Sequence, residues 1–532
     1  MNYRLSQLRR LPSIALIVTL AWSIEALSVR GDDFFFVDPG GSDSNPGTEN
    51  APWATLQWAA DHVGVGDRVT VRPGTYDGFY LTADGELGNP IEFLAMPGVL
   101  INEENGTTPD GINLEGASHV VIDGFEVAGM ERTGVRTVGL PSSFATNVTI
   151  RNVYAHHNGS WGILTGHVNN LLIENNRMTN SVLEHGIYVS NSGDNPIVRN
   201  NITSDNAGAG IQLNADESEG GDGVITNALI SGNVIFNNGA AGGSAINLDG
   251  VQNSRIENNL LYNNLASGIS LFQDDGAFGS SGNQVVNNTI HVPDDTRWAL
   301  NIQNASTNNF VRNNILINDD LLINNSGFRG AIDISADSLP GFSSDYNVLT
   351  PSFTTTGGNS TMDLAEWQAA TNQDANSLAI ESADLAELLI NAAAGNYHLV
   401  AGSLAHEAAL LAPAPDFDLL GRLRPYGASV DIGALERVLP GDYNADGEVN
   451  AADYTVWRNS RGRLVLRGAG ADGDLNGTIS LADYTLWKAN YGQSVPGAGG
   501  SFGHSPFVPE PGIWTSLLSL AFFASQRRGH RR

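Results

Sequence analysis

A ladder of short strand-like repeats between Gly111 and Asn314 constrains this 532-residue chain more than any other feature. Each repeat opens with a small residue and an aliphatic one, and successive starts are separated by 23, 28, 24, 24, 35, 23 and 31 residues. The repeats are GINLEG at 111, GVRTVG at 134, GILTGH at 162, GIYVSN at 186, GIQLNA at 210, AINLDG at 245, GISLFQ at 268 and ALNIQN at 299. Strand patterning at such a period is typical of a solenoid whose coils stack on one another. A β-sandwich with turns about every 8–12 residues fits the strand lengths but not the fixed phase.

Most repeats contain a second strand that ends in a pair of asparagines. The pairs are Asn175–Asn176, Asn200–Asn201, Asn258–Asn259, Asn287–Asn288 and Asn313–Asn314. Asparagine at a fixed phase suits a turn, where inward-pointing amides can hydrogen-bond along the stack. The aliphatic second residue of each repeat should point into the core. We therefore predict a mostly β fold, a parallel β-helix.

The charge and the rare residue types exclude several classes of function. The chain has 27 basic and 57 acidic residues, for a net charge of −30, which argues against nucleic acid or an anionic membrane as a partner. Its single lysine, Lys488, lies outside the ladder, so no mechanism there can use a lysine. Without cysteine the chain has no disulfide, thiolate nucleophile or cysteine-bound metal.

Both ends of the chain have the composition of targeting segments. Residues 1–28 combine arginines, a short broken apolar run and small residues, which predicts a secretory signal peptide. Residues 508–532 contain VPEP, an apolar run and a basic end, and they resemble a PEP-CTERM sorting signal. The resemblance implies a secreted or cell-surface protein that meets a membrane only through this tail. Residues 493–507, rich in Gly, Ser and Pro, form the expected linker.

The segments that flank the ladder resemble the two ends of known β-helix proteins. Residues 33–110 contain SDSNPGT, PWATLQWA and GDRVTVRPGTY, with helical spacing from Thr55 to Val63. This order resembles the N-terminal cap of right-handed parallel β-helix proteins of the pectate-lyase-like superfamily, which implies a helix over the open end of the core. Residues 351–437 resemble the closing segment of surface β-helix proteins, through NYHLVAGSLAH, DFDLLGRLRP and VDIGALE. We expect that segment to pack over the last coils and to end a β-helix domain spanning 33–437.

Residues 440–492 contain two copies of a twelve-residue loop followed by a helix, in GDYNADGEVNAADYTVW and DGDLNGTISLADYTLW. Oxygen donors at alternating positions, with glycine at the sixth, suit Ca²⁺. The candidate ligands are Asp442, Asn444, Asp446, Glu448 (carbonyl), Asn450 and Asp453 in loop one, and Asp472, Asp474, Asn476, Thr478 (carbonyl), Ser480 and Asp483 in loop two. Aspartate at position 12 and the tandem arrangement resemble a type I dockerin, a small α-helical domain. The resemblance implies bound calcium and a cohesin-like protein partner, which Tyr454–Thr455 and Tyr484–Thr485 at the equivalent helix starts could contact.

The outward face of the ladder is the predicted binding surface. Side chains alternate faces in a strand, so equivalent outward residues should form columns with neighbours roughly 4.8 Å apart. Amide, aromatic and guanidinium groups in such columns suit sugar hydroxyls and rings. The predicted substrate-binding residues are Arg136, Gln212, Asn214, Asn247 and Phe272.

Two groups on this face are candidates for catalysis. In the first, His185 and Tyr188 could act as base and acid in β-elimination from a uronate, while Glu184 orients the imidazole. In the second, Asp216 and Asp249 could supply the two carboxylates of glycoside hydrolysis, or could bind calcium in the groove. Each group also fits a plain turn or a solvated rim.

These patterns predict a surface-delivered β-helix protein that binds and cleaves a polysaccharide, as a lyase or as a glycoside hydrolase. A non-catalytic adhesion or glycan-binding protein is the alternative. The motifs of related enzymes do not decide between them. A lysine base is impossible here, and the polygalacturonase pattern of paired aspartates with a Gly-His-Gly segment is absent.

Overall fold

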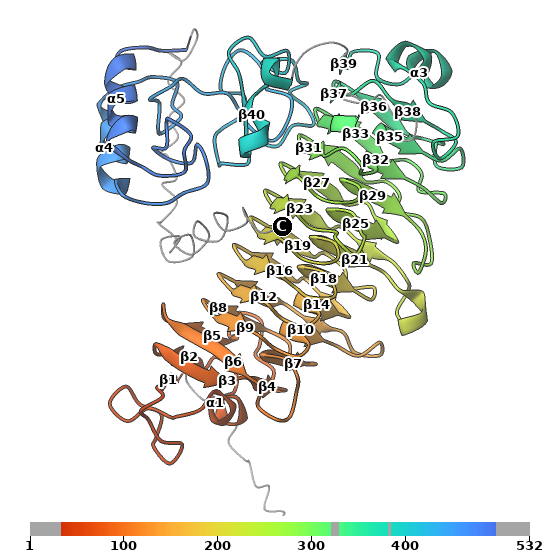
Figure 1. The fold of residues 1–532 in the computed structure, drawn as a ribbon. Helices are drawn as coiled ribbons and strands as arrows, with labels where there is room; N and C mark the ends of the chain where they lie inside the picture. The colour runs from red at the N-terminus through yellow and green to blue at the C-terminus, as the bar shows by residue number, and fades with distance from the viewer. Residues whose placement is uncertain (1–32, 321–328, 381–384, 496–532) are drawn as a thin grey trace, which may run out of the picture. The chain divides into compact units, whose positions relative to one another are not determined.

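The computed structural model describes residues 33–320, 329–380 and 385–495 (Figure 1). The predicted signal peptide at 1–28, the sorting tail at 508–532 and most of the linker lie outside the described residues. No helix among the described residues is long and apolar enough to cross a membrane.

Three long parallel sheets, here named A, B and C, run along a solenoid, which confirms the predicted parallel β-helix. Sheet A contains β1 (Phe34–Val37), β2 (Arg68–Val71), β5 (Ile91–Ala95), β8 (Val120–Asp123), β12 (Val148–Arg151), β16 (Leu172–Glu174), β19 (Ile197–Arg199), β23 (Leu229–Ser231), β27 (Arg255–Glu257), β30 (Gln284–Val286), β33 (Phe310–Arg312) and β36 (Ser343–Asp345). Sheet B contains β4 (Phe79–Leu81), β7 (Ile112–Glu115), β10 (Thr133–Val138), β14 (Trp161–Gly166), β18 (Ile187–Ser190), β21 (Ile211–Asn214), β25 (Ile246–Asp249), β29 (Ile269–Phe272), β32 (Trp298–Ile302), β35 (Gly330–Ile334) and β38 (Phe353–Thr354). Sheet C contains β3 (Gly74–Asp77), β6 (Val99–Glu103), β9 (Glu126–Ala128), β13 (Tyr154–His156), β17 (Arg177–Thr179), β20 (Ile202–Ser204), β24 (Val234–Phe236), β28 (Leu260–Tyr262), β31 (Thr289–Val292), β34 (Ile315–Asn318), β37 (Val348–Leu349) and β39 (Leu378–Ala379).

Shorter elements border these sheets. The strand pairs are β11 (Ala145–Thr146) with β15 (Val168–Asn169), β22 (Ile225–Thr226) with β26 (Val251–Gln252), and the antiparallel β40 (Leu389–Asn391) with β41 (Asn396–Leu399). The helices are α1 (Leu56–His62), α3 (Leu364–Thr371), α4 (Ala451–Ser460) and α5 (Leu481–Asn490), with 3₁₀ turns η1 (Glu217–Glu219), η2 (Leu385–Glu387) and η3 (Ala392–Ala394). Thr55 caps α1, and Leu56, Ala59 and Ala60 are buried, as the predicted cap helix requires.

The inward column of sheet B follows the predicted register throughout. Its members pair directly with one another and are fully buried: Ile112, Val135, Ile163, Ile187, Ile211, Ile246, Ile269 and Leu300. Parallel pairing places the same position of each coil above its equivalent, so the repeat builds a continuous apolar core.

The predicted asparagine ladder lies at the turn between sheets A and C. Its buried members are Asn176, Asn201, Asn233, Asn259, Asn288, Asn314 and Asn347. Each side-chain amide donates to the carbonyl oxygen of the next; Asn259 Nδ2, for instance, lies 3.0 Å from Asn288 Oδ1. The first asparagine of each pair adopts a left-handed backbone, as Asn258 does at φ 53°, which asparagine tolerates better than most residues. The two asparagines of a pair therefore have different roles, one conformational and one hydrogen-bonding.

The closing segment packs on the outward face of sheet C. Val234, Leu260 and Ile315 on that face form a second apolar cluster with Tyr397 and Leu435 of the closing segment. Two acidic residues of the segment are buried and bonded: the carboxylate of Asp418 accepts three backbone N–H groups, and Glu436 pairs with the buried Arg424. Their structural role, expected from the sequence, is confirmed by these contacts.

Candidate functional site

The outward column of sheet B brings the predicted binding residues into register. Its members, each paired with the next, are Tyr80, Asn113, Arg136, Leu164, Tyr188, Gln212, Asn247, Ser270, Asn301, Asp333 and Thr354. A second column runs from Glu115 through Val138, Gly166, Ser190, Asn214 and Asp249 to Phe272. We call the outward surface of sheet B formed by these two columns the B face.

Side chains of neighbouring coils on the B face form hydrogen bonds and an ion pair with one another. Asn247 Nδ2 donates to Gln212 Oε1 at 2.7 Å, and Gln212 is mostly buried. Arg136 donates to Asn113 Oδ1 at 3.1 Å and forms an ion pair with Glu115. The only predicted cationic substrate ligand is therefore neutralised within the protein.

His185, Tyr188 and Trp161 form an aromatic cluster at the middle of the B face. The rings of His185 and Tyr188 meet edge to face with centroids 5.2 Å apart, and Trp161 lies 6.2 Å from Tyr188. Trp161 Nε1 is buried without a hydrogen-bond partner. Trp161 was not among the predicted residues, although its place as the residue before the GILTGH repeat puts it at the start of β14.

A backbone hydrogen bond determines the protonation of His185. Its Nδ1 accepts from the Ala209 N–H at 2.9 Å, so the proton of the neutral ring is on Nε2, which lies 3.6 Å from Glu184 Oε2. Burial lowers the pKa of His185 to about 4. At neutral pH the ring therefore has no free lone pair, and this geometry suits a fixed N–H donor better than the predicted general base.

Tyr188 connects the two groups of candidate catalytic residues, the histidine–tyrosine group and the acidic group, which the sequence predicts as separate. Asn214 Nδ2 lies 3.3 Å from Tyr188 Oη and 3.0 Å from Asp275 Oδ2, so one amide bridges the phenol and an acidic loop. Burial raises the pKa of Tyr188, the hydrogen bond with Asn214 opposes this shift, and the nearby carboxylates add smaller increases. The phenol is protonated at neutral pH and can act as a proton donor.

Asp249 holds the loop that follows β29. Its two carboxylate oxygens accept the backbone N–H groups of Asp274, Asp275 and Gly276 at 2.9, 2.8 and 3.2 Å. The side chain is 1% exposed, and burial raises its pKa while these N–H groups oppose the shift. Both oxygens are thus engaged by backbone, which is a positioning geometry.

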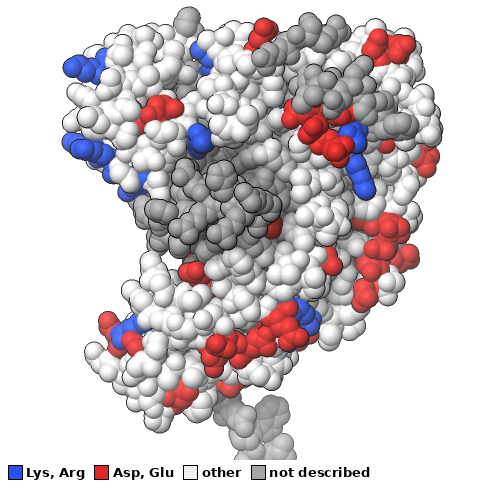
Figure 2. Space-filling model, in the orientation of Figure 1, with Lys and Arg blue, Asp and Glu red and all other residues white. Residues whose placement is uncertain are grey.

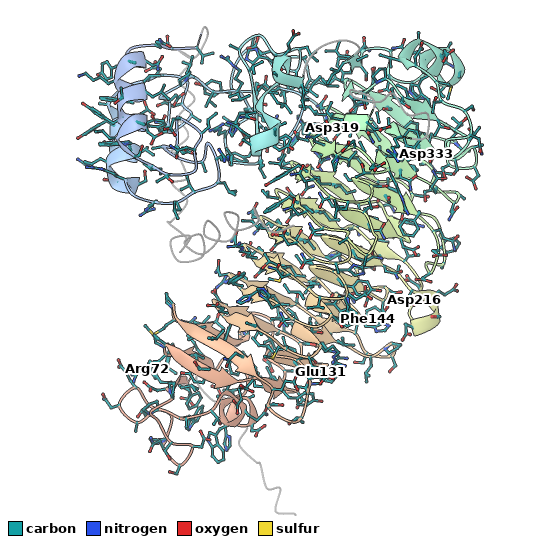
Figure 3. The ribbon with its side chains drawn as sticks, in the orientation of Figure 1. Arg72, Glu131, Phe144, Asp216, Asp319 and Asp333 are labelled. Atoms are coloured by element: carbon teal, nitrogen blue, oxygen red, sulfur yellow. The ribbon has the colours of Figure 1, made fainter. Side chains whose placement is uncertain are left out.

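Asp216 begins the long insertion that follows β21. Its Oδ1 accepts the N–H and the hydroxyl of Ser218 at 2.8 and 2.6 Å, and its backbone forms a bridge to Gly276. Figure 2 shows acidic side chains gathered at the right edge of the molecule, near the place where Figure 3 labels Asp216. Asp216 is therefore more exposed than Asp249 and borders the B face with a negative loop.

Asp333 extends the same outward column toward the C-terminal coils (Figure 3). It is 6% exposed, and burial raises its pKa to about 6. The sequence could have indicated that Asp333 lies in this column, because aligning the AIDISA segment with the ALNIQN repeat places Asp333 opposite Asn301.

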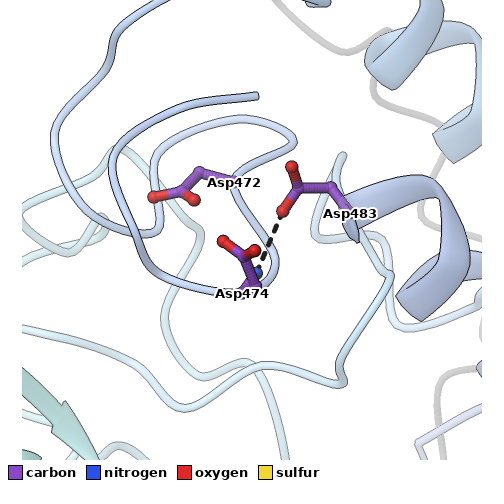
Figure 4. A group of neighbouring side chains, drawn as sticks. All are labelled: Asp472, Asp474 and Asp483. Carbon is purple, nitrogen blue, oxygen red and sulfur yellow. Dashed lines mark hydrogen bonds between the residues drawn. The ribbon is translucent and has the colours of Figure 1, made fainter. Parts of the chain in front are cut away.

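The two predicted calcium loops share several equivalent hydrogen bonds. In loop one, Asp442 accepts the N–H of Gly447, and Asp453 accepts the N–H groups of Tyr443 and Asn444. In loop two, Asp472 accepts the N–H of Gly477, and oxygens of Asp472, Asp474 and Asp483 lie within 4.8 Å of one another (Figure 4). Asn450 and Ser480 cap α4 and α5, with Asp453 and Asp483 completing the capping boxes. The backbone thus turns the carboxylates of each loop inward, and hard oxygen donors of this kind fit Ca²⁺.

The two helices that follow these loops pack through their aromatic residues. Tyr454, Trp457, Tyr484 and Trp487 form one cluster with ring centroids 5.0 to 6.1 Å apart. Both tyrosines are half-buried, whereas Thr455 and Thr485 are exposed. The threonines, rather than the tyrosine rings, offer most of the free surface at the equivalent helix starts.

Comparison with known proteins supports the β-helix assignment. Residues 35–182 match the family model described as the Pel9A-like right-handed β-helix region. The crystal structure of pectate lyase Pel9A superposes with a TM-score of 0.50 at 17% identity, covering 77% of this chain and 98% of that one. A rhamnogalacturonan lyase structure gives 0.44 at 18% identity, covering 67% and 90%. The protein YwoF of Bacillus subtilis (strain 168) is 39% identical over 62 residues, which is 12% of this chain and 13% of that protein. The family-model match and the likeness to Pel9A support the fold, a right-handed parallel β-helix.

Proposed function

We propose that this protein binds a polysaccharide along the B face and cleaves it at the cluster of His185, Tyr188 and Trp161. The observation that supports this most directly is the bridge from Tyr188 through Asn214 to Asp275, which joins aromatic, donor and acidic groups beside a line of amides. Aromatic rings next to hydrogen-bonding side chains match the alternating apolar and hydroxyl surfaces of a sugar chain. The likeness of the fold to pectate lyase Pel9A agrees with this class of substrate.

The cluster supplies proton donors more readily than bases. Tyr188 has a raised pKa and can give its proton to the leaving glycosidic oxygen, while the fixed Nε2–H of His185 orients the substrate. Glu184 is a half-exposed carboxylate beside His185, and its oxygens can accept a proton. In β-elimination Glu184 would take the proton; in hydrolysis the carboxylates of Asp216 and Asp275 would serve instead.

A non-catalytic glycan-binding protein is the second candidate, and one observation favours it. Arg136 is paired with Glu115, Asp249 is occupied by three backbone N–H groups, and His185 has no free lone pair. A face whose charged groups are mutually satisfied is preorganised for binding but is short of free catalytic groups.

Incubation of the purified protein with polyuronates and neutral glycans separates the two candidates. New reducing ends accompanied by the absorbance of an unsaturated uronate would identify a lyase. New reducing ends without that absorbance would identify a hydrolase. Retarded migration on glycan-containing gels without any product would support the binding protein. If no glycan in the panel gave a product or retarded migration, both candidate functions would be contradicted.

We propose further that residues 440–492 form a dockerin-like module that binds two calcium ions and a cohesin-like protein. The paired loops, the capped helices and the clustered oxygens of loop two support the calcium sites. Calcium ligands that come together only in the folded module should stabilise it, by about 4 kcal/mol when free calcium exceeds the Kd a thousandfold. Calorimetry with and without a chelator measures this, and an unchanged module transition would contradict calcium binding.

We propose that the protein is secreted and delivered to the cell surface. The composition of residues 1–28 and 508–532 supports this proposal. Mass spectrometry of the mature protein, recovered from medium and surface fractions, would show removal of the first segment. A full-length chain confined to the cell interior would contradict it.

A further inference from the structure

The two calcium loops differ in what holds their first ligand. In loop two, Asp472 Oδ2 accepts two backbone N–H groups from within the module, from Gly468 and Gly477, both at 2.8 Å. In loop one, Asp442 Oδ2 accepts only one backbone N–H, from Gly447 at 2.8 Å. The second donor to Asp442 is the phenol of Tyr426, at 2.6 Å. Tyr426 belongs to the closing segment of the β-helix, outside the module.

Tyr426 is itself held by the closing segment. Its hydroxyl accepts the N–H of Leu439 at 3.1 Å, and its backbone N–H donates to Glu436 Oε2 at 3.3 Å. Glu436 pairs with the buried Arg424, and it directly follows Leu435 of the apolar cluster that packs on sheet C. A rigid phenol therefore reaches from the β-helix to a carboxylate that is 3% exposed.

The geometry points to Tyr426 as a positioning residue for calcium loop one, so that the β-helix raises the calcium affinity of loop one and not of loop two. This inference rests on the proposed calcium binding and assigns to it a residue outside both loops. A donor on Oδ2 of Asp442 fixes the carboxylate rotamer before an ion arrives, which lowers the ordering cost of binding. Residues that orient metal ligands in this way typically contribute about 10- to 100-fold in affinity.

Loop two is connected to the β-helix more remotely. Arg422 of the closing segment donates to the backbone carbonyl of Gly468, whose N–H in turn reaches Asp472. Arg422 thus acts on a peptide group and not on a ligand. Substitution of Arg422 should change the affinity of loop two much less than substitution of Tyr426 changes that of loop one.

Calcium titration calorimetry on the full chain tests the inference in variants that keep only one functional calcium loop. Asp474→Ala disables loop two and reports loop one, whereas Asp446→Ala disables loop one and reports loop two. We expect Tyr426→Phe to weaken loop one about tenfold and to leave loop two within about twofold. Tyr454→Phe, which removes a hydroxyl from the aromatic cluster of the same module, is the matched control and should change neither loop.

The outcomes separate this inference from the calcium proposal. Two titratable sites in the unmodified chain, with loop one insensitive to Tyr426→Phe, would overturn the inference alone. Equal weakening of both loops would show a general loss of module structure and would also overturn it. No calcium binding by the unmodified chain would overturn the calcium proposal together with the inference.

Discussion

The asparagine ladder and the B face are built from the same repeat, yet they differ in how strictly the repeat specifies them. Along the ladder every coil supplies the same residue type to the same bond, from Asn176 to Asn347. Along the B face the residue type changes at almost every coil, from Arg136 through Leu164 and Tyr188. Stacking requires asparagine at the buried turn of each of these coils, because a buried amide without a hydrogen-bond partner lowers the stability of the fold. The outward column is not held to one repeated hydrogen bond, although members such as Gln212 and Ser270 are also buried, so its residue types can vary from coil to coil.

The largest expected effect is in the ladder. Asn259→Ala removes a side chain that accepts from the N–H and Nδ2 of Asn233 and donates to Ile230 O and Asn288 Oδ1. Leaving several buried polar groups unpaired should lower the free energy of unfolding by about 3 kcal/mol. Asn247→Ala on the B face is the matched control, with an expected loss below about 1 kcal/mol. Denaturant titration of both variants measures the difference, and equal losses would remove the distinction between the two regions.

His185 should make the stability of the B face pH-dependent. Its pKa of about 4 lies below the ordinary value of 6.5, so between these values the unfolded chain binds a proton that the folded chain does not. The resulting stability is complete above pH 6.5 and is lost as the pH falls toward 4, by about 2 kcal/mol between pH 7 and pH 5. Comparing the pH dependence of the free energy of unfolding of His185→Gln with that of the unmodified protein separates the contribution of His185 from that of other groups, such as Asp333. Parallel pH profiles for the two proteins would show that His185 titrates normally.

Asp249 is an exception that sharpens the comparison, because it lies in an outward column but is bonded like an interior residue. Asp249→Ala deprives the N–H groups of Asp274, Asp275 and Gly276 of their acceptor. We expect a loss of about 1 to 2 kcal/mol and faster amide exchange in that loop. Asp216→Ala, which frees only exposed groups of Ser218, should cost less than about 1 kcal/mol. Hydrogen-exchange measurements that show an unchanged loop in Asp249→Ala would contradict the positioning role.

The sequence predicts the repeated parts of this molecule far better than its site. The inward register from Ile112 to Leu300 and the asparagine ladder follow from a period that every coil must obey. The helix over 56–62 follows from local spacing and a threonine cap. These features depend on interactions within one coil or between neighbours, which a one-dimensional pattern records.

The site depends on contacts that the period does not record. The Ala209 N–H that fixes the His185 tautomer comes from the following coil. The bridge from Asn214 to Asp275 spans 61 residues through a loop of irregular length. The hydrogen bond from Tyr426 to Asp442 joins two segments that the sequence predicts to be different domains. Each contact depends on the path of a turn or loop, and repeat spacing does not determine that path.

The most direct test of the proposed function compares two hydroxyl deletions in the same column. Tyr188→Phe removes the phenol that contacts Asn214, whereas Tyr80→Phe removes one that lies four coils away and outside the cluster. Neither change should cost more than about 1 kcal/mol of folding stability. On the glycan that the unmodified protein cleaves, we expect Tyr188→Phe to lower kcat/KM about 100-fold and Tyr80→Phe to leave it within about twofold. Equal rates for Tyr188→Phe and the unmodified protein would show that the His185–Tyr188 cluster is not the site of cleavage.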